Sequence, residues 1–147
     1  MAENTRFRPG QRLHQASEFS AVFKNRRVLR SRLFDLHWRS SMPGQELQTS
    51  RLGLVIPKRL ARRAVMRNLM KRIAREAFRH RLVMLPPMDL VLKLARKPAL
   101  IPGEPGLVHP ADKVFRQQLA EEIDALLLSL PGVAAHAVRA DAPLKAD

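Results

Sequence analysis

The sequence predicts a small α+β domain in which helices pack on a short sheet. The 147-residue chain is 46% hydrophobic, enough to fold around one core. Two long stretches, 62–81 and 112–130, carry apolar residues at helical spacing. Three short stretches, 32–39, 51–56 and 89–95, have the composition of strands. With a shorter helix at 16–24, the order helix, strand, strand, helix, strand, helix is typical of an α+β domain.

The N-terminal half begins with this short helix. Residues 16–24 place Phe19, Val22 and Phe23 at helical spacing, next to Ser17, a residue type that caps helices. Residues 32–39 alternate, which predicts a half-buried strand. One face of this strand is apolar and the other polar: Phe34, Leu36 and Trp38 against Asp35, His37 and Arg39. Residues 41–49 contain Pro and Gly and predict a loop.

The C-terminal half continues the pattern. Residues 51–56 predict a strand that ends at Pro57, which has no backbone N–H to donate. The third strand, 89–95, is followed by a Pro- and Gly-rich loop at 98–110 and the last helix at 112–130. Residues 131–147 lack apolar periodicity and are rich in Ala, so we expect a disordered tail. The expected organisation is one folded domain over 1–130 followed by the tail over 131–147.

The charge predicts a polyanionic partner. Lys and Arg number 27 against 13 acids, a net charge of +14. Residues 51–81 hold eleven basic residues and one acid, whereas residues 110–147 hold four basic residues and six acids. Such self-repulsion opposes folding unless an anion such as nucleic acid binds. A role in solubility alone is the alternative.

Residues 62–81 predict an amphipathic helix with a cationic face. On a helical wheel, the apolar arc holds Val65, Met66, Leu69, Met70, Ile73 and Ala77. The opposite arc holds Arg67, Asn68, Lys71, Arg72, Arg75 and Arg79. Like charges four residues apart repel, so bound phosphates would stabilise this face. A solvated face would carry acids, but only Glu76 is present, and a membrane-surface helix would carry several aromatics, but only Phe78 is present.

The residues do not form a pattern typical of a protein catalyst. The chain has no cysteine, and its five histidines are scattered without metal-ligand spacing. The acids at 121, 122 and 124 suit a solvated helix face better than a metal site. There is no secretory signal pattern and no apolar stretch long enough to cross a bilayer, so a cytoplasmic location without membrane contact is expected.

The central sequence also resembles a family signature. It reads RLG at 51–53, VIPKR at 55–59 and AVMRNLMKRIAREAFR at 64–79, with further matching blocks at 12–23 and 89–98. These blocks resemble the protein subunit of bacterial ribonuclease P, over about residues 12 to 128 of this chain. Two positions depart from the family pattern, in which Arg-Asn-Arg and Ser-Lys-Lys are usual. Leu69 replaces the second arginine, so no RNA contact is expected there, and Pro57 replaces the serine.

This resemblance implies a fold and a division of labour. The fold would be an α/β sandwich with a small mixed sheet and the basic helix in an unusual left-handed crossover. An RNA subunit would cut the 5′ leader from precursor tRNA with Mg²⁺ bound by RNA, so the protein would have no catalytic or metal-binding residues. The residues expected to bind the catalytic RNA are Lys58, Arg59, Arg62, Arg67, Asn68, Lys71, Arg72 and Arg75.

The resemblance also implies a cleft for the single-stranded leader between the first helix and the sheet. Phe19 and Phe23 lie one helical turn apart, and aromatic rings in a cationic groove commonly stack on RNA bases. If the larger apolar face of strand 32–39 is core, His37 and Arg39 face the leader. Core packing of the two phenylalanines is the alternative. For the whole chain, a structural RNA-binding protein of ribosomal type is the second hypothesis, and a DNA-binding or membrane-surface protein the third.

Overall fold

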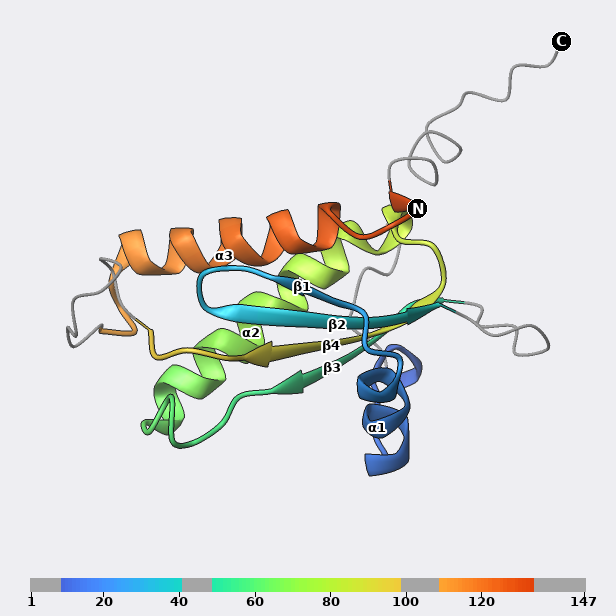
Figure 1. Ribbon diagram of the computed structural model, residues 1–147. Helices are drawn as coiled ribbons and strands as arrows, with labels where there is room; N and C mark the ends of the chain where they lie inside the picture. The colour runs from blue at the N-terminus through green and yellow to red at the C-terminus, as the bar shows by residue number, and fades with distance from the viewer. Residues whose placement is uncertain (1–8, 41–48, 99–108, 134–147) are drawn as a thin grey trace, which may run out of the picture.

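A computed structural model describes residues 9–40, 49–98 and 109–133 and shows a four-stranded sheet with helices on both faces (Figure 1). The α+β class predicted from the sequence is confirmed. In chain order the elements are the 3₁₀ turn η1 (Pro9–Gln11), α1 (Ala16–Lys24), β1 (Val28–Arg30), β2 (Phe34–Ser40), β3 (Arg51–Val55), α2 (Ala64–Arg81), the 3₁₀ turn η2 (Leu82–Met84), β4 (Met88–Leu94) and α3 (Lys113–Leu128).

The sheet is mixed, with the strand order β1-β2-β4-β3. β2 pairs antiparallel with β1 and β4, whereas β3 pairs parallel with β4. In Figure 1 both β3 and β4 run to the left, β4 lies above β3, and α2 connects them behind the sheet. The β3–α2–β4 crossover is therefore left-handed, as the family resemblance implies, although such crossovers are almost always right-handed.

The main core lies between one face of the sheet and the two long helices. Alternate residues of the strands point toward α2 and α3, because side chains on a strand alternate between its faces. These core residues include Phe34 and Leu36 of β2, Leu52 of β3, and Leu90, Leu92 and Leu94 of β4. α2 contributes Met70, Ala74 and Phe78, and α3 contributes Phe115, Leu119 and Ile123. The inner face of the sheet thus packs against α2 and α3 in the main core.

The opposite face of the sheet carries α1 and a second, smaller cluster. Its buried residues are Leu13, Val22 and Val91, with Phe19, Phe23 and Val55 packed against them. α1 covers only part of this outer face, because it is nine residues long. Charged side chains of β2, β3 and β4 also point to this outer face, because they alternate with the core residues along each strand.

Several predicted boundaries differ from the observed ones. The first predicted strand begins at residue 34 rather than 32, and the long helices occupy 64–81 and 113–128. Ser17 is not the cap of α1: the helix begins at Ala16, and the Glu18 carboxylate accepts hydrogen bonds from the backbone of His14 at 3.0 Å and of Gln15 at 2.9 Å. β1 was missed because three residues are too few to show alternation. Most of the predicted loops 41–49 and 98–110 lies outside the described residues.

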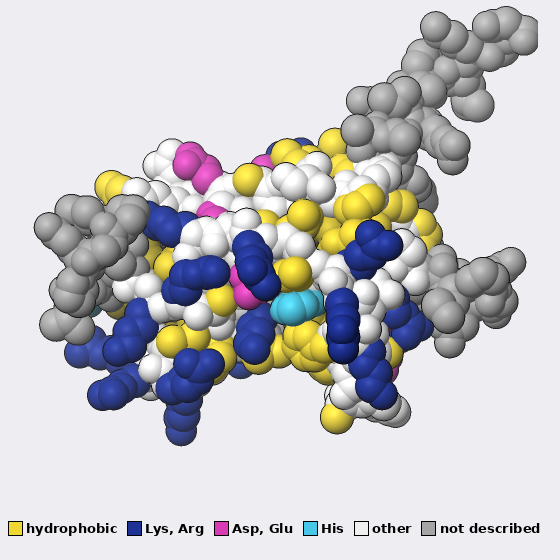
Figure 2. Space-filling view, viewed as in Figure 1, with side chains coloured by type: hydrophobic (Ala, Val, Ile, Leu, Met, Phe, Trp, Pro, Cys, Tyr) yellow, Lys and Arg dark blue, Asp and Glu magenta, His cyan; other side chains and the backbone are white. Residues whose placement is uncertain are grey.

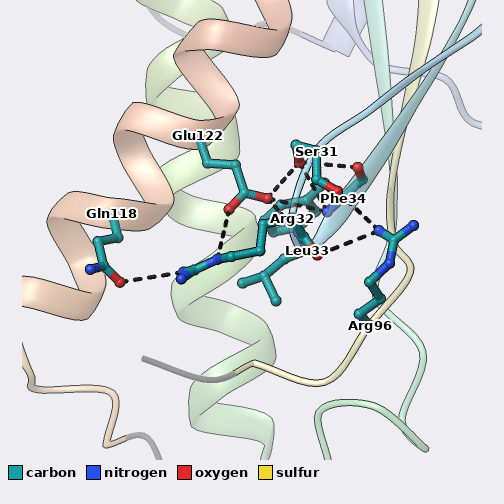
Figure 3. A network of polar contacts seen from close by, with 7 residues as sticks. All are labelled: Ser31, Arg32, Leu33, Phe34, Arg96, Gln118 and Glu122. Atoms are coloured by element: carbon teal, nitrogen blue, oxygen red, sulfur yellow. Dashed lines mark hydrogen bonds and ion pairs between the residues drawn. The ribbon is translucent and has the colours of Figure 1, made fainter. Parts of the chain in front are cut away.

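Arg32 and Leu33 belong to the β1–β2 turn rather than to β2, and Glu122 of α3 holds this turn (Figure 3). Its carboxylate accepts hydrogen bonds from the Ser31 hydroxyl at 2.5 Å and from the Leu33 backbone at 2.7 Å. It also forms an ion pair with Arg32 at 3.8 Å. Glu122, which the sequence pattern assigned to a solvated face, therefore joins α3 to the turn of the sheet.

The C-terminal end of α3 continues into ordered structure. Leu130 and Val133 are both buried in the main core, with 3% and 2% of their surfaces exposed. Val133 therefore packs on the domain, although the sequence pattern assigned it to the tail. The rest of the predicted tail, residues 134–147, lies outside the described residues.

Candidate nucleic-acid interface

The outward side of α2 and the loop before it carry a set of basic residues, which we call the α2 surface. We define it by the predicted residues Lys58, Arg59, Arg62, Arg67, Asn68, Lys71, Arg72 and Arg75. Lys58, Arg59 and Arg62 are exposed in the loop, and α2 turns its apolar side to the core. Leu69, which replaces the family arginine, is 4% exposed and packs in this core. The helix therefore separates an apolar face from a cationic one, as its pattern predicts.

One residue of the predicted apolar arc lies elsewhere. Val65 is 65% exposed, so its assignment to the buried arc is wrong. It precedes Met66, and on a wheel it stands about 100° away from that buried residue. This rotation carries Val65 out of the core and toward Asn68, on the cationic side of the helix.

Arg67 differs from the other cations of the α2 surface because it contacts the backbone. Its Nη1 donates hydrogen bonds to the carbonyl oxygens of Ala61 at 2.9 Å and Arg62 at 2.8 Å. These carbonyls belong to the loop that carries Lys58, Arg59 and Arg62. The guanidinium therefore fixes this loop against the first turn of α2. A sequence pattern could not have revealed this contact, because it depends on the path of the loop.

Arg75 lies half-buried beside a second arginine from the N-terminal segment. Leu13 donates its backbone N–H to Leu52 at 3.2 Å, which brings the N-terminal segment to the edge of β3. Burial, and then the positive charge of Arg12, lower the pKa of Arg75 below its ordinary value. Two like charges held together in a folded protein favour the binding of an anion. Arg12 is thus a further candidate for the α2 surface that the charge pattern of the helix alone did not indicate.

Arg72 faces a groove between α2 and α3. The groove has a volume of about 780 Å³, and its walls include His80 and Arg81 of α2 and Glu121 and Asp124 of α3. Arg81 is bound to Asp124 through two hydrogen bonds of 2.6 and 2.8 Å. Acids of α3 therefore neutralise the C-terminal end of α2, whereas its N-terminal end and the preceding loop stay strongly cationic.

A second candidate surface lies on the outer face of the sheet, beside α1. The rings of Phe23 and His37 meet edge to face, with their centroids 4.8 Å apart. Both side chains are half-buried, so each also keeps an exposed part. Arg39 follows on the same face of β2, two residues beyond His37. The structure therefore brings Phe23 and His37 into contact and places Arg39 on the same face of β2 as His37.

The environment of His37 favours its neutral form. Partial burial, the largest cause, lowers the pKa of His37 below its ordinary value of 6.5, and the cations Lys93 and Arg30 lower it further. The Asp35 carboxylate acts in the opposite direction. At neutral pH the ring is therefore uncharged, and it can stack on a base without the cost of desolvating a charge.

Phe19 joins this surface by lying directly on the sheet. Its ring covers Gly53 of β3 so closely that a Cβ at Gly53 would stand 2.6 Å from Cζ of Phe19. The same Cβ would stand 3.1 Å from Leu13. Phe19 therefore has a packing role in the small core. Its ring also remains partly exposed.

An ion-pair network fixes α1 on this face, and sequence reasoning missed it. The guanidinium of Arg51 binds both carboxylate oxygens of Asp89 at 2.7 and 2.8 Å and Glu18 of α1 at 2.6 Å. Asp89 is only 2% exposed, so its charge depends on Arg51. Hydrogen bonds to Asp89 raise the pKa of Arg51 still further above its ordinary value. These three residues are far apart in the sequence, and no local pattern connects them.

The charge distribution of the whole face agrees with an RNA interface. Figure 2 shows Lys and Arg side chains spread over both ends of the face that carries α1, with few acidic side chains among them.

In the residues described, no group of three His, Asp or Glu side chains could hold a metal ion. Within the same residues, no helix is long and apolar enough to cross a membrane.

Comparisons with known proteins agree with this geometry. The sequence profile of the family described as Ribonuclease P matches residues 7–117. The ribonuclease P protein component of Azoarcus sp. is 52% identical over 89 residues, which cover 60% of this chain and 71% of the relative. That of Ralstonia pickettii is 39% identical over 126 residues, which cover 84% of this chain and 85% of the relative.

Solved structures share the fold. The RNase P protein of Staphylococcus aureus superposes with a TM-score of 0.61 at 20% identity, over 80% of this chain and 92% of that protein. The RNase P protein of Thermotoga maritima superposes with a TM-score of 0.58 at 23% identity, over 82% of this chain and 98% of that protein. With the fold, the basic helix and the sequence signature in agreement, the chain belongs to the ribonuclease P protein family.

Proposed function

We propose that this chain binds the catalytic RNA of ribonuclease P through the α2 surface and the 5′ leader of precursor tRNA through the outer face of the sheet. The observation that carries the proposal is that the α2 surface and the outer face of the sheet lie on opposite sides of the sheet and differ in chemical character. The α2 surface is cationic and lies beyond the inner core, whereas the outer face combines aromatic rings with cations. Two different surfaces suit two different RNA partners.

The α2 surface suits the phosphates of a folded RNA. Asn68 and Arg72 are exposed on α2, and Lys71 lies on the same side of the helix. Cations on a rigid helix keep fixed spacing, so several phosphates can be bound without much loss of side-chain freedom. A folded RNA presents phosphates at fixed positions, whereas a single strand does not. We therefore assign the catalytic RNA to this surface.

The outer face suits a single strand. The Phe23 and His37 rings expose apolar edges, and Arg39 adds a positive charge on the same face. Unpaired bases stack on aromatic side chains, and each stack contributes about 1–3 kcal/mol. Phe19 supports this surface from below through its contact with Gly53. The leader is the single-stranded part of precursor tRNA, so we assign it to this face.

The chemistry belongs to the RNA subunit in this proposal. That subunit, with the Mg²⁺ that it binds, would cut the leader, and the protein would hold both RNAs in position. We place this activity in the cytoplasm, where precursor tRNA would be matured.

Reconstitution tests the proposal directly. Cleavage of precursor tRNA by the catalytic RNA is measured at low Mg²⁺ concentration with and without the protein. We expect the protein to increase the cleavage rate and the affinity for precursor tRNA more than the affinity for mature tRNA. A ribosomal RNA-binding protein of equal charge serves as the control. If it stimulates cleavage equally, the effect comes from charge alone and the proposal is wrong.

A further inference from the structure

The groove between α2 and α3 shares only Arg72 with the α2 surface. The two helices lie side by side over the inner face of the sheet, and both pack in the main core (Figure 1). They leave between them a space of about 780 Å³, which lies within the range of ordinary ligand sites. We call this space the α2–α3 groove. Its volume suits a ligand of the size of one nucleotide.

The apolar part of the groove lining consists of small or partly buried side chains. Ile73 and Ala77 of α2 line the groove and pack against the main core, so their positions are fixed. Ala120 of α3 also lines it and is exposed. Because alanine has no side chain beyond Cβ, the space beside Ala120 stays open. The flat face of a nucleobase suits an open apolar lining of this kind.

The His80 ring stands at the same groove and is held by a neighbour on α2. Its Nε2 lies 3.0 Å from the Glu76 carboxylate, which also accepts a hydrogen bond from Arg79. The His80 side chain is 62% exposed, so this contact orients the ring and leaves most of it accessible. Unpaired RNA bases commonly stack on histidine rings. His80 and the apolar lining therefore provide two surfaces for one base.

Arg72 supplies the groove with a cation for one phosphate. The residue is exposed, and within the described part of the chain its guanidinium has no ion-pair partner. Arg81, nine residues further along α2, is instead bound to Asp124 through hydrogen bonds of 2.6 and 2.8 Å. Nine residues of helix span about 14 Å, so the two arginines lie far apart. The groove is therefore suited to a single phosphate at Arg72 rather than to a run of phosphates.

Glu121 of α3 supplies a hydrogen-bond acceptor in the groove. The residue is exposed, and its Oε1 accepts one hydrogen bond, from Gln117 at 3.1 Å. A carboxylate has about four acceptor sites, so Glu121 keeps the capacity to bind a ligand. Guanine presents two adjacent N–H donors on its Watson–Crick edge, N1 and the 2-amino group, and one carboxylate accepts both. The other three bases place acceptors beside their donor on this edge, and a carboxylate repels these acceptors.

We propose that the α2–α3 groove binds one unpaired guanosine of the catalytic RNA. The base lies on the apolar lining beside His80, its Watson–Crick edge donates to Glu121, and its phosphate contacts Arg72. The inference rests on the proposed function, because Arg72 belongs to the surface that we assign to the catalytic RNA. It adds recognition of a base to an interface whose other contacts are with phosphates.

The test uses the full chain, the catalytic RNA and kethoxal, a reagent that modifies N1 and the 2-amino group of unpaired guanine. We expect one guanosine that reacts in the free RNA to be protected by the wild-type protein. The first variant, Ala120→Leu, fills the groove from an exposed position. The second, Glu121→Gln, removes the carboxylate. The control is Ala125→Leu, which adds the same side chain at an exposed position of α3 that does not line the groove.

We expect Ala120→Leu and Glu121→Gln to weaken affinity for the catalytic RNA about 5- to 150-fold, the range of one bidentate base contact. Both should restore the reactivity of the protected guanosine, whereas Ala125→Leu should behave like the wild type. The direction of the Glu121→Gln effect is decisive, because loss of an acid that acts only through its charge would increase affinity for RNA. Replacement of the protected guanosine by adenosine should weaken binding of the wild type but not of Ala120→Leu.

Three outcomes would overturn the inference. The first is a wild-type complex in which no guanosine is protected, or in which Ala120→Leu leaves the protection unchanged. The second is an increase in affinity with Glu121→Gln, and the third is an equal loss with Ala120→Leu and Ala125→Leu. Melting temperatures establish that the variants are folded. In each case, stimulation of cleavage by the wild-type protein separates this failure from failure of the proposed function, which removes the stimulation itself.

Discussion

Phe19 of α1 lies directly on the backbone of Gly53 in β3, so close that no side chain fits between them. A Cβ on Gly53 would approach Cζ of Phe19 to 2.6 Å, shorter than real contacts of this kind. The glycine therefore sets how near α1 approaches the sheet. The position of α1 on the outer face, and with it the shape of the candidate leader surface, therefore depends on the absence of a side chain at Gly53.

Gly53→Ala should displace Phe19 and lower the stability of the domain. Overpacking of this kind costs about 1–3 kcal/mol, and the free energy of unfolding from urea titration measures it. Gly10→Ala is a matched control, because a Cβ there would meet nothing within 4 Å. Equal stability of both variants would show that α1 can move away from the sheet without cost.

Phe23→Leu separates stacking on the leader from packing in the core. Leucine keeps most of the apolar packing in the small cluster, so we expect a loss of stability below about 1.5 kcal/mol. Removal of the ring should weaken affinity for precursor tRNA by about 1–3 kcal/mol and leave the affinity for mature tRNA unchanged. Equal losses for both tRNAs, or a large drop in melting temperature, would assign Phe23 to the core alone.

Lys71→Ala should weaken binding to the catalytic RNA and reduce its salt dependence. Each phosphate that the protein no longer neutralises lowers the slope of log affinity against log salt by about 0.7–0.9, depending on whether the RNA is single- or double-stranded there. The melting temperature should stay near that of the wild type, because Lys71 lies outside the core. Lys113→Ala removes the same charge from α3 and provides the control. If both variants show the same slope, charge alone explains the binding.

Arg67 should act through the loop that it holds as well as through its own charge. Its two hydrogen bonds to Ala61 and Arg62 fix the loop that carries Arg59. In a double-mutant cycle of Arg67→Gln and Arg59→Ala, we therefore expect the losses of affinity for the catalytic RNA to be non-additive. Additive losses would mean that Arg67 and Arg59 bind the RNA independently. Lys71→Ala, combined with Arg59→Ala, should be additive and serves as the reference cycle.

Acid should remove the stabilising effect of Glu18. Backbone hydrogen bonds from Gln15 and His14, and then Arg51, hold the pKa of Glu18 below its ordinary value of 4.5. A carboxylate whose pKa is lower in the folded state stabilises the fold above its unfolded pKa, and the effect is lost as pH falls through the folded value. Glu18→Gln should therefore be less stable than the wild type at about pH 7, with the difference shrinking as the pH falls below the ordinary Glu18 pKa of 4.5. A difference that is constant with pH would show that charge on Glu18 is not involved.

Periodicity within single segments was enough to predict most helices and strands, and with them the two-sided character of α2. Burial of Met66 and Met70 opposite Asn68 and Arg75 follows from a repeat of 3.6 residues, which a short stretch of sequence records completely. The alternation along 32–39 similarly placed His37 and Arg39 opposite Phe34 and Leu36. The family signature added the crossover and the expected division between two RNA partners.

Which distant groups meet could be learned only from the folded chain. The contacts of Phe19 with Gly53, of Arg51 with Glu18 and Asp89, and of Arg67 with the loop carbonyls join residues on different elements or across a loop. Their formation depends on the distance between elements and on the path of the chain, and neither leaves a periodic trace in the sequence. The same holds for the exposed side chain of Val65 and for the left-handed backbone of Arg26, because solvent exposure and backbone strain are set by packing around them.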